Sequence, residues 1–513
     1  MSTASVLGVR LLLWVLIASS YPLSAQVIQN GRFELPIQDD DQEKFKAHPL
    51  GEGGIMLYRR NVSQKQDMLE LIRLDTGLRQ RWKGFISIDR NAVILKTQSR
   101  QNLFFLLLKD RNYIGGDFRI VAVHIDNGNY GYYTVKNYIP FSPSEFVLTN
   151  EAAMIGGYFN LRPIVLYFSF QKQVSKILPG FFNLPGELNQ VKTNEDGSVD
   201  VIVSAKNYQK RKGLWIRNYD SHGELARTIV LEPEEDKQLL FGRSIQLTDG
   251  SQLVAGVYGR FTEYSRGIFV ASVNNNGDYA IRYYNFADLE NFFNYMKAKK
   301  QKRVKDRIER RKIRGKKLKF NYRFLIHDLI PYQNQLIMAG EAFYPHYTYP
   351  NQASIAGRSF GYYGNSFGPG SMYLPSRTDV IFDGYQYTHA AVIGLAKNGN
   401  LIWDNSFEVN DVRSMQLEQY VTVKTEKDRI ILMYLFRNAI RTKIIRDREV
   451  LEGKSNDQMR TNFTEEKVDV KSIESEKLVS WYGEYLYAFG VQKVVGDNGR
   501  SRRVYFINKI TYH

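Results

Sequence analysis

Residues able to carry out chemistry gather between positions 327 and 389 of the chain. The set is His327, Asp328, Glu341, His346, Asp383 and His389. Two histidines and a carboxylate are a donor set that zinc accepts, and a pair of carboxylates can hydrolyse a glycosidic bond. The residue types therefore support one enzyme hypothesis: a hydrolase or lyase acting on polysaccharide, with His327, Glu341, Asp383 and His389 as candidate catalytic residues.

The spacing of these residues matches no catalytic signature. The sequence contains no His-Glu-x-x-His, no Gly-x-Ser-x-Gly and no phosphate-binding glycine loop, which are the motifs that tie a reaction to a local geometry. Polar residues at the ends of strands also bond neighbouring loops without any chemistry. We therefore expect no metal and no cofactor, and the sequence favours a binding protein over an enzyme.

The elements that must position these residues form a repeat. A compact apolar strand is followed by a second strand, a turn rich in Asp, Asn and Gly, and a third strand. Clear copies are "DGSQLVAGVYG" (249–259) with "IFVASVNNNGDYAIRYY" (268–284), and "NQLIMAGEAF" (334–343) with "AVIGLAKNGNLIWDNSF" (391–407). Asx-Gly turns supply the positive φ of tight hairpins, and the β-branched and aromatic flanks favour strands.

Eight such units can be followed along the chain, which predicts an all-β fold. Radial repetition of four-stranded units is a β-propeller. With two insertions left out, residues 26–513 divide into eight units of about 51 residues, near the ~40–50 residues of propeller repeats. We predict a single eight-bladed domain, with seven blades as the alternative because some copies are weak. The orphan strand "GRFELPI" (31–37) would complete the last blade.

These repeats resemble those of secreted bacterial β-propeller proteins with blades of the "DGS-x-LVAG" type. The resemblance covers most of residues 30–513 and places the chain in an uncharacterised branch, since it lacks Trp-Asp and kelch blade signatures. It implies a propeller fold, and it implies no reaction, because propellers serve many functions.

The N-terminus has the pattern of a secretory signal peptide. Arg10 precedes the apolar run from Leu11 to Ala18, and small residues end at Ala25, as cleavage requires. The chain has no cysteine, which excludes disulfides and thiolate chemistry. We predict that residues 1–25 are removed on export, that no membrane-spanning helix remains, and that the protein resides in the periplasm or at the outer membrane of a bacterium, as a monomer or part of a complex.

The formal charge of +17 is concentrated in one segment. Residues 297–319 hold fourteen Lys or Arg and only two acids, a local charge of +12. We predict a basic helical insertion over 286–320, with Asp288 and Glu290 near its start, Phe293, Met296, Val304 and Ile308 on one face, and Gly315 at its end. The cations expected to bind are Lys299, Lys300, Lys302, Arg303, Arg307, Arg310, Arg311 and Arg314.

Such an arm would dock on an acidic envelope protein or an anionic membrane surface. The alternative is a solvated helix folded over the propeller by its apolar stripe. Nucleic acid is disfavoured, because no aromatic residues interleave the cations.

A second insertion, 344–390, is rich in Tyr, Gly and Ser, a composition typical of adaptable binding loops. Tyr347, Tyr362 and Tyr363 are its candidate binding residues; the alternative is a loop that packs on its own propeller. Because strands alternate in direction, both insertions should leave the same face of the propeller.

Overall fold

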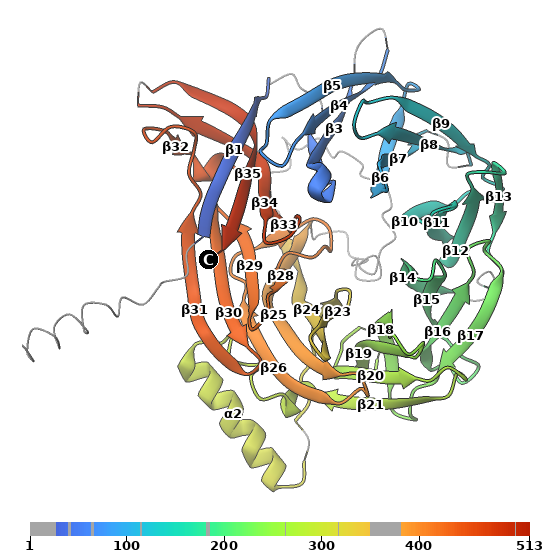
Figure 1. The fold of residues 1–513 in the computed structure, drawn as a ribbon. Coiled ribbons are helices and arrows are strands. Elements are labelled where there is room, and N and C mark those ends of the chain that lie inside the picture. Colours follow the sequence, from blue (N-terminus) through green and yellow to red (C-terminus); the bar gives the residue numbers. More distant parts are fainter. Residues whose placement is uncertain are drawn as a thin grey trace, which may run out of the picture.

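The fold is an eight-bladed β-propeller, seen down its axis in Figure 1. The computed structural model describes residues 27–38, 43–62, 66–112, 115–180, 185–261, 263–316, 318–348, 381–497 and 499–512. Eight separate antiparallel sheets follow one another around the ring. The eight-blade prediction is confirmed, and the seven-blade alternative is wrong.

The first four blades are regular four-stranded sheets in which each strand pairs with the next along the chain. Their strands, from the inner to the outer, are β2 (Lys46–Pro49), β3 (Ile55–Asn61), β4 (Met68–Leu74) and β5 (Gln80–Ser87); β6 (Ala92–Arg100), β7 (Leu103–Asp110), β8 (Phe118–His124) and β9 (Tyr130–Val135); β10 (Ser142–Leu148), β11 (Ala152–Phe159), β12 (Arg162–Ser169) and β13 (Val174–Ile177); β14 (Gly186–Thr193), β15 (Val199–Lys206), β16 (Lys212–Tyr219) and β17 (Leu225–Leu231).

Blades five to seven continue the pattern, and blade six carries two extra short strands. The strands are β18 (Gln238–Gln246), β19 (Gln252–Gly259), β20 (Gly267–Val273) and β21 (Tyr279–Asn285); β22 (Arg323–Ile326), β23 (Ile330–Tyr332), β24 (Gln335–Thr348), β25 (Ile381–Ala396), β26 (Leu401–Glu408) and β27 (Arg413–Ser414); β28 (Thr422–Thr425), β29 (Ile430–Phe436), β30 (Ala439–Arg446) and β31 (Glu449–Gln458).

Blade eight joins the two ends of the described chain. It contains β32 (Lys467–Val468), β33 (Ser475–Ser480), β34 (Leu486–Val495), β35 (Ser501–Tyr512) and, as its outer strand, β1 (Val27–Pro36). β1 pairs with β35 along most of its length, from Val27 opposite Tyr512 to Pro36 opposite Val504. The predicted closing strand is thus confirmed, and it covers an edge that would otherwise expose unpaired backbone groups.

The core of the protein lies between blades rather than within them. The described residues form eight apolar clusters, and each one joins two neighbouring blades; the cluster that contains Ile55, Leu74, Tyr487 and Tyr505 joins blade one to blade eight. The second strands lie tightly against their neighbours. A Cβ on Gly256 would lie 2.0 Å from the carbonyl oxygen of Phe241, so only glycine fits there.

The hairpin turns have the geometry that the Asx-Gly pattern predicts. Between β20 and β21, Gly277 has a φ of 92°. Asn274 Oδ1 accepts hydrogen bonds from the backbone N–H groups of Asn276 and Asp278, at 3.0 and 2.9 Å. The side chain therefore closes the turn from within, which accounts for the recurrence of Asx at this position.

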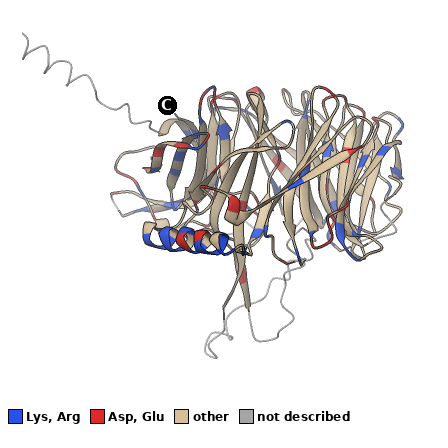
Figure 2. Cartoon of the chain, turned by 90° about the horizontal axis from the view of Figure 1, so that it is seen from below, with Lys and Arg blue, Asp and Glu red and all other residues tan. Residues whose placement is uncertain are grey.

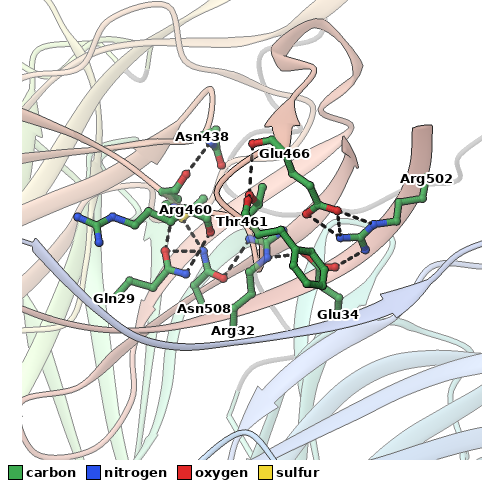
Figure 3. Close-up of polar contacts among 11 residues, drawn as sticks. Gln29, Arg32, Glu34, Asn438, Arg460, Thr461, Glu466, Arg502 and Asn508 are labelled. Atoms are coloured by element: carbon green, nitrogen blue, oxygen red, sulfur yellow. Dashed lines mark hydrogen bonds and ion pairs between the residues drawn. The ribbon is translucent and has the colours of Figure 1, made fainter. Parts of the chain in front are cut away.

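A buried ionic network fastens β1 to blade eight (Figure 3). Glu34 accepts a hydrogen bond from Arg32 at 2.6 Å and pairs with Arg502, which in turn contacts both carboxylate oxygens of Glu466 at 2.9 Å. Arg32 also donates to Asn508 at 3.1 Å. The side chains of Arg32 and Glu34 are only 2% and 7% exposed, and burial lowers the pKa of the Arg32 guanidinium.

We expect Glu34→Ala to lower the free energy of unfolding by about 3 kcal/mol, because it leaves the buried Arg32 without its carboxylate. The matched control is Lys44→Ala, which removes an exposed pair with Glu474 and should cost less than about 1 kcal/mol. Urea unfolding followed by circular dichroism measures both. Equal costs for the two variants would contradict a closure that depends on the buried network.

Candidate functional site

The basic insertion is anchored on blades five and six. Its helix, α2 (Ala298–Ile313), runs along the rim of the ring (Figure 1). Figure 2 shows α2 at the face of the propeller toward which the β24–β25 hairpin also extends. The connection from β21 to β22 and the hairpin between β24 and β25 share this face, which we call the α2 face.

The helix is shorter than the sequence predicted. Phe293 and Met296 lie in turns before α2, and η2 (Phe286–Asp288) holds Asp288. The prediction that these residues and Glu290 belong to the basic helix is wrong, and the first turn of α2 contains no acid. The reason lies in the propeller. The side chain of Asp404 in blade six accepts the backbone N–H hydrogen bonds of Glu290 and Asn291, which helical carbonyl groups would otherwise accept.

The carboxylate of Asp404 clamps the start of the insertion. It accepts hydrogen bonds from the backbone N–H groups of Glu290 and Asn291, at 2.9 and 2.7 Å. Asn291 donates back to the Asp404 carbonyl at 3.1 Å, and Ser406 donates to the Asn291 carbonyl at 2.8 Å. Burial raises the pKa of Asp404. The sequence signal for this clamp was an acid in the middle of the predicted strand "LIWDNSFE", where Asp404 is buried.

The end of α2 is as predicted. Gly315 has a φ of 64°, its N–H donates to Lys312 O at 3.0 Å, and Lys316 N–H donates to Arg311 O at 2.9 Å. This pair of bonds is a Schellman motif, which needs a residue in the left-handed region after the helix. The C-terminal end of α2 is thus capped by its own backbone, while its N-cap residue, Lys297, makes no side-chain capping bond.

One side of α2 packs on the propeller, and the other side carries its charge. Val304 and Ile308 are half-buried against the cluster between blades five and six. Every Lys and Arg of α2 is exposed. Seven of the eight predicted binding cations are among them, and the eighth, Arg314, is exposed directly after the helix. Within the described part of the chain, no carboxylate forms an ion pair with any of them. The apolar stripe that would hold a helix on the propeller exists, and the cations remain available.

The candidate catalytic residues do not form one site. In the β24–β25 ladder, Ala342 lies opposite His389 and Glu341 lies opposite Ala390. Opposed residues share a face of a sheet and successive residues alternate, so Glu341 and His389 point to opposite faces of blade six. Their surroundings agree with this, because Glu341 meets blade seven and His389 meets the insertion.

Glu341 joins two blades. Its carboxylate accepts hydrogen bonds from the backbone N–H of Tyr420, at 3.0 and 3.1 Å, and from that of Val421. Both residues directly precede the inner strand of blade seven. His327 Nε2 lies 3.3 Å from the same carboxylate. Glu341 is 1% exposed, and its oxygens are occupied by the backbone, as in a structural link between blades.

His389 is enclosed in an aromatic cluster that holds the insertion. Its ring stacks on Tyr295, with centroids 3.7 Å apart and planes 3° apart, and meets Phe292 edge-on at 5.0 Å. Nδ1 lies 3.0 Å from the Thr388 hydroxyl. The residue is fully buried, and desolvation lowers its pKa to about 3, so the imidazole is neutral at physiological pH.

Asp383 lies apart, on the hairpin that extends from the α2 face. It pairs with Arg413, and His346 Nδ1 lies 3.5 Å from it. Asp328 lies 3.6 Å from Arg243 of blade five. Within the described ranges, no group of three His, Asp or Glu side chains could hold a metal ion.

The predicted Tyr/Gly-rich loop is narrower than 344–390. Residues 344–348 and 381–390 are strand, because β24 and β25 continue beyond the other blades' hairpins. Tyr347 lies beside Phe382, with ring centroids 5.8 Å apart, so it is part of a ladder. Tyr362 and Tyr363 lie outside the described residues, as does the predicted signal peptide. No helix of the described chain has the length and apolarity of a membrane span.

No family model matches the sequence, and no curated protein matches it. Solved structures with a similar fold include the polysaccharide lyase Uly1, with 9% identity, a TM-score of 0.40, and 81% of this chain and 89% of that chain covered. The β-propeller domain of the Trilobed protease from Pyrococcus furiosus has 8% identity, a TM-score of 0.35, and coverages of 81% and 98%. Similarities this weak carry no argument about function.

We expect Asp404→Ala to loosen the insertion, since two backbone N–H groups lose their buried acceptor. The control is Glu290→Ala, which removes only an exposed contact with Arg448 at 3.6 Å. Limited trypsin digestion should cut within 297–319 several-fold faster in the Asp404 variant and at the parental rate in the control. Equal rates in both variants would contradict the clamp.

We also expect His389 to make stability depend on pH. Its pKa is about 3 in the folded protein, against 6.5 for a free histidine. The unfolded chain therefore binds the extra proton first, and stability is full above pH 6.5 and is lost as the pH falls toward 3. In His389→Phe, the loss of unfolding free energy between pH 6.5 and 4.5 should be smaller by about 2 kcal/mol.

The control for this change is His222→Phe, because the His222 side chain is 70% exposed. Urea unfolding at a series of pH values measures all three proteins. An unchanged pH dependence in His389→Phe would show that the imidazole is not held neutral by burial.

Proposed function

We propose that the protein is a non-enzymatic binding protein of the bacterial envelope that docks through α2 on an anionic surface or an acidic protein. The observation that carries the proposal is the array of exposed cations on a helix fixed to the propeller rim. The predicted export signal supports the location. Of the four candidate catalytic residues, His327 and Glu341 form a buried pair, while Asp383 and His389 lie elsewhere, and this separation supports binding rather than catalysis.

The charge of α2 is unfavourable to the isolated helix. Lys299, Arg303, Arg307 and Arg311 are spaced four residues apart, and like charges at this spacing repel by about 0.2–0.5 kcal/mol per pair. The first turn adds cations at the end where the helix dipole is positive. Contacts of Val304 and Ile308 with the propeller offset this cost. A helix so charged gains stability when an anionic partner approaches.

The line of cations on α2 suits an extended anionic surface that approaches the rim of the α2 face, beside the projecting β24–β25 hairpin. In Figure 2, the helix axis runs parallel to this face, so that several cations can approach one plane together. Each Lys or Arg near an anionic lipid surface contributes about 1 kcal/mol. An acidic protein with a matching row of carboxylates would use the same cations.

We test the proposal with a variant in which Lys299, Lys302 and Arg310 become Gln. These residues lie opposite Val304 and Ile308 around the helix. Binding to vesicles containing phosphatidylglycerol should weaken by about 3 kcal/mol, roughly a hundredfold, at low salt, and should weaken with added salt in the parent protein. Vesicle co-sedimentation measures the affinity.

The matched control changes Lys172, Lys397 and Lys427 to Gln. These exposed residues lie in turns on the opposite face of the ring, and the variant has the same net charge as the α2 variant. A pulldown from envelope extract with the same proteins tests the acidic-protein form of the proposal. Equal losses in both variants, or no binding by the parent in either assay, would overturn docking through α2.

A further inference from the structure

A polar cavity opens on the α2 face beside the insertion. Its volume is about 400 Å³, within the range of small-ligand sites. One wall comes from the β17–β18 connection, with Glu234, Asp236 and Lys237. The other wall comes from the two ends of the insertion, with Asp288 before α2 and Lys319 after it. The insertion thus contributes one side of the cavity, and blade five with the β17–β18 connection contributes the rest.

Two tyrosines of blade five line the cavity, the buried Tyr258 and the half-buried Tyr283. The rings of Tyr258 and Tyr283 meet edge-on, with centroids 5.1 Å apart. Burial raises the pKa of both hydroxyls to about 12, so they stay protonated. The Tyr283 hydroxyl accepts the N–H of Glu234 at 3.4 Å and keeps its own proton to donate. Asn285 adds an amide. Aromatic rings beside hydrogen-bonding groups suit an amphipathic ligand.

The first group of charges in the cavity is paired within the protein, with one lysine between two carboxylates. Lys237 pairs with Glu234 and lies 3.6 Å from Asp236. Its ammonium also sits 4.5 Å from the Tyr283 ring centroid. These three residues hold the β17–β18 wall together and leave it with a net charge of −1.

The second group of charges has no partner of opposite sign. Among the described residues, no carboxylate forms an ion pair with Arg260, Arg266 or Lys319. No Lys or Arg of these residues forms an ion pair with Asp288. The whole lining thus carries four cations and three acids, and the excess positive charge lies on the side of Arg260, Arg266 and Lys319. Guanidinium groups recognise carboxylate and phosphate by paired hydrogen bonds, so the unpaired charges favour an anion.

From this arrangement, we infer that the cavity binds an anionic sugar unit, whose carboxylate or phosphate meets Arg266 and Lys319 and whose ring lies beside Tyr283. The inference goes beyond the proposed docking by α2 and does not rest on it, because a small soluble ligand can enter the cavity whether or not α2 touches a surface. Asp288 would oppose the anion, which gives the site a group whose removal should strengthen binding.

The test is isothermal titration calorimetry with four soluble probes. Digalacturonate carries carboxylates, glucose 6-phosphate carries a phosphate, maltose is neutral, and inorganic phosphate is an anion without a sugar. We expect saturable binding of digalacturonate or of glucose 6-phosphate, which identifies the anionic group, and much weaker binding of maltose and of inorganic phosphate.

Three variants test where the sugar binds. Arg266→Gln combined with Lys319→Gln should weaken binding at least about tenfold, and Asp288→Asn should strengthen it. The α2 variant with Lys299, Lys302 and Arg310 changed to Gln should leave it unchanged, which separates this site from the docking surface. Unaltered thermal unfolding shows that each variant is folded.

The inference is overturned if neither anionic sugar binds, or if inorganic phosphate binds as tightly as the sugars. It is also overturned if the Arg266 and Lys319 changes have no effect in a folded protein. For the aromatic contact, Tyr283→Phe tests the hydroxyl while keeping the ring, and an unchanged affinity for all probes in Tyr283→Leu would overturn the role of the ring.

Discussion

The pairing of β1 with β35 is the constraint on which the rest of the structure depends. Each apolar cluster needs two blades, so no blade has a complete core alone, and the cluster between blades one and eight forms only when the ring is closed. The strand from the start of the described chain completes the sheet built at its end. The pair of buried charges Arg32 and Glu34, which Arg502 joins from the surface, then fixes the register of this strand, because a shift would leave charges buried without partners.

A closed ring gives the insertion a rigid base. Glu341 and His389 are residue types that suggest catalysis. In the structure, these two residues and Asp404 each attach one part of the chain to a neighbouring part. Asp404 holds the insertion on blade six, Glu341 holds blade six on blade seven, and His389 holds Tyr295 on the hairpin. Buried polar groups with satisfied bonds specify geometry. The consequence is that α2 presents its cations in a fixed direction and that a cavity persists between the insertion and blade five.

The repeat made the fold predictable, while the site depended on contacts that a sequence does not display. Strand alternation and Asx-Gly turns are local, so the blades, their number and the closing strand could be derived. The start of α2 could not, because it depends on Asp404, which lies far along the chain in another strand. His327, Glu341, Asp383 and His389 are near in sequence, but the two-residue period of β24 and β25 sends Glu341 and His389 to opposite faces of blade six. Of the four, only His327 and Glu341 come together. The cavity was missed because Tyr258, Arg266 and Lys319 come from three segments with no common motif.

The most direct measurement of the central claim is hydrogen–deuterium exchange of the full chain with and without vesicles containing phosphatidylglycerol. Docking through a preformed cationic helix predicts slower exchange in 298–313 on binding, with the turns of the opposite face unchanged. Exchange that slows only on the opposite face, or nowhere while the vesicles are bound, would contradict it.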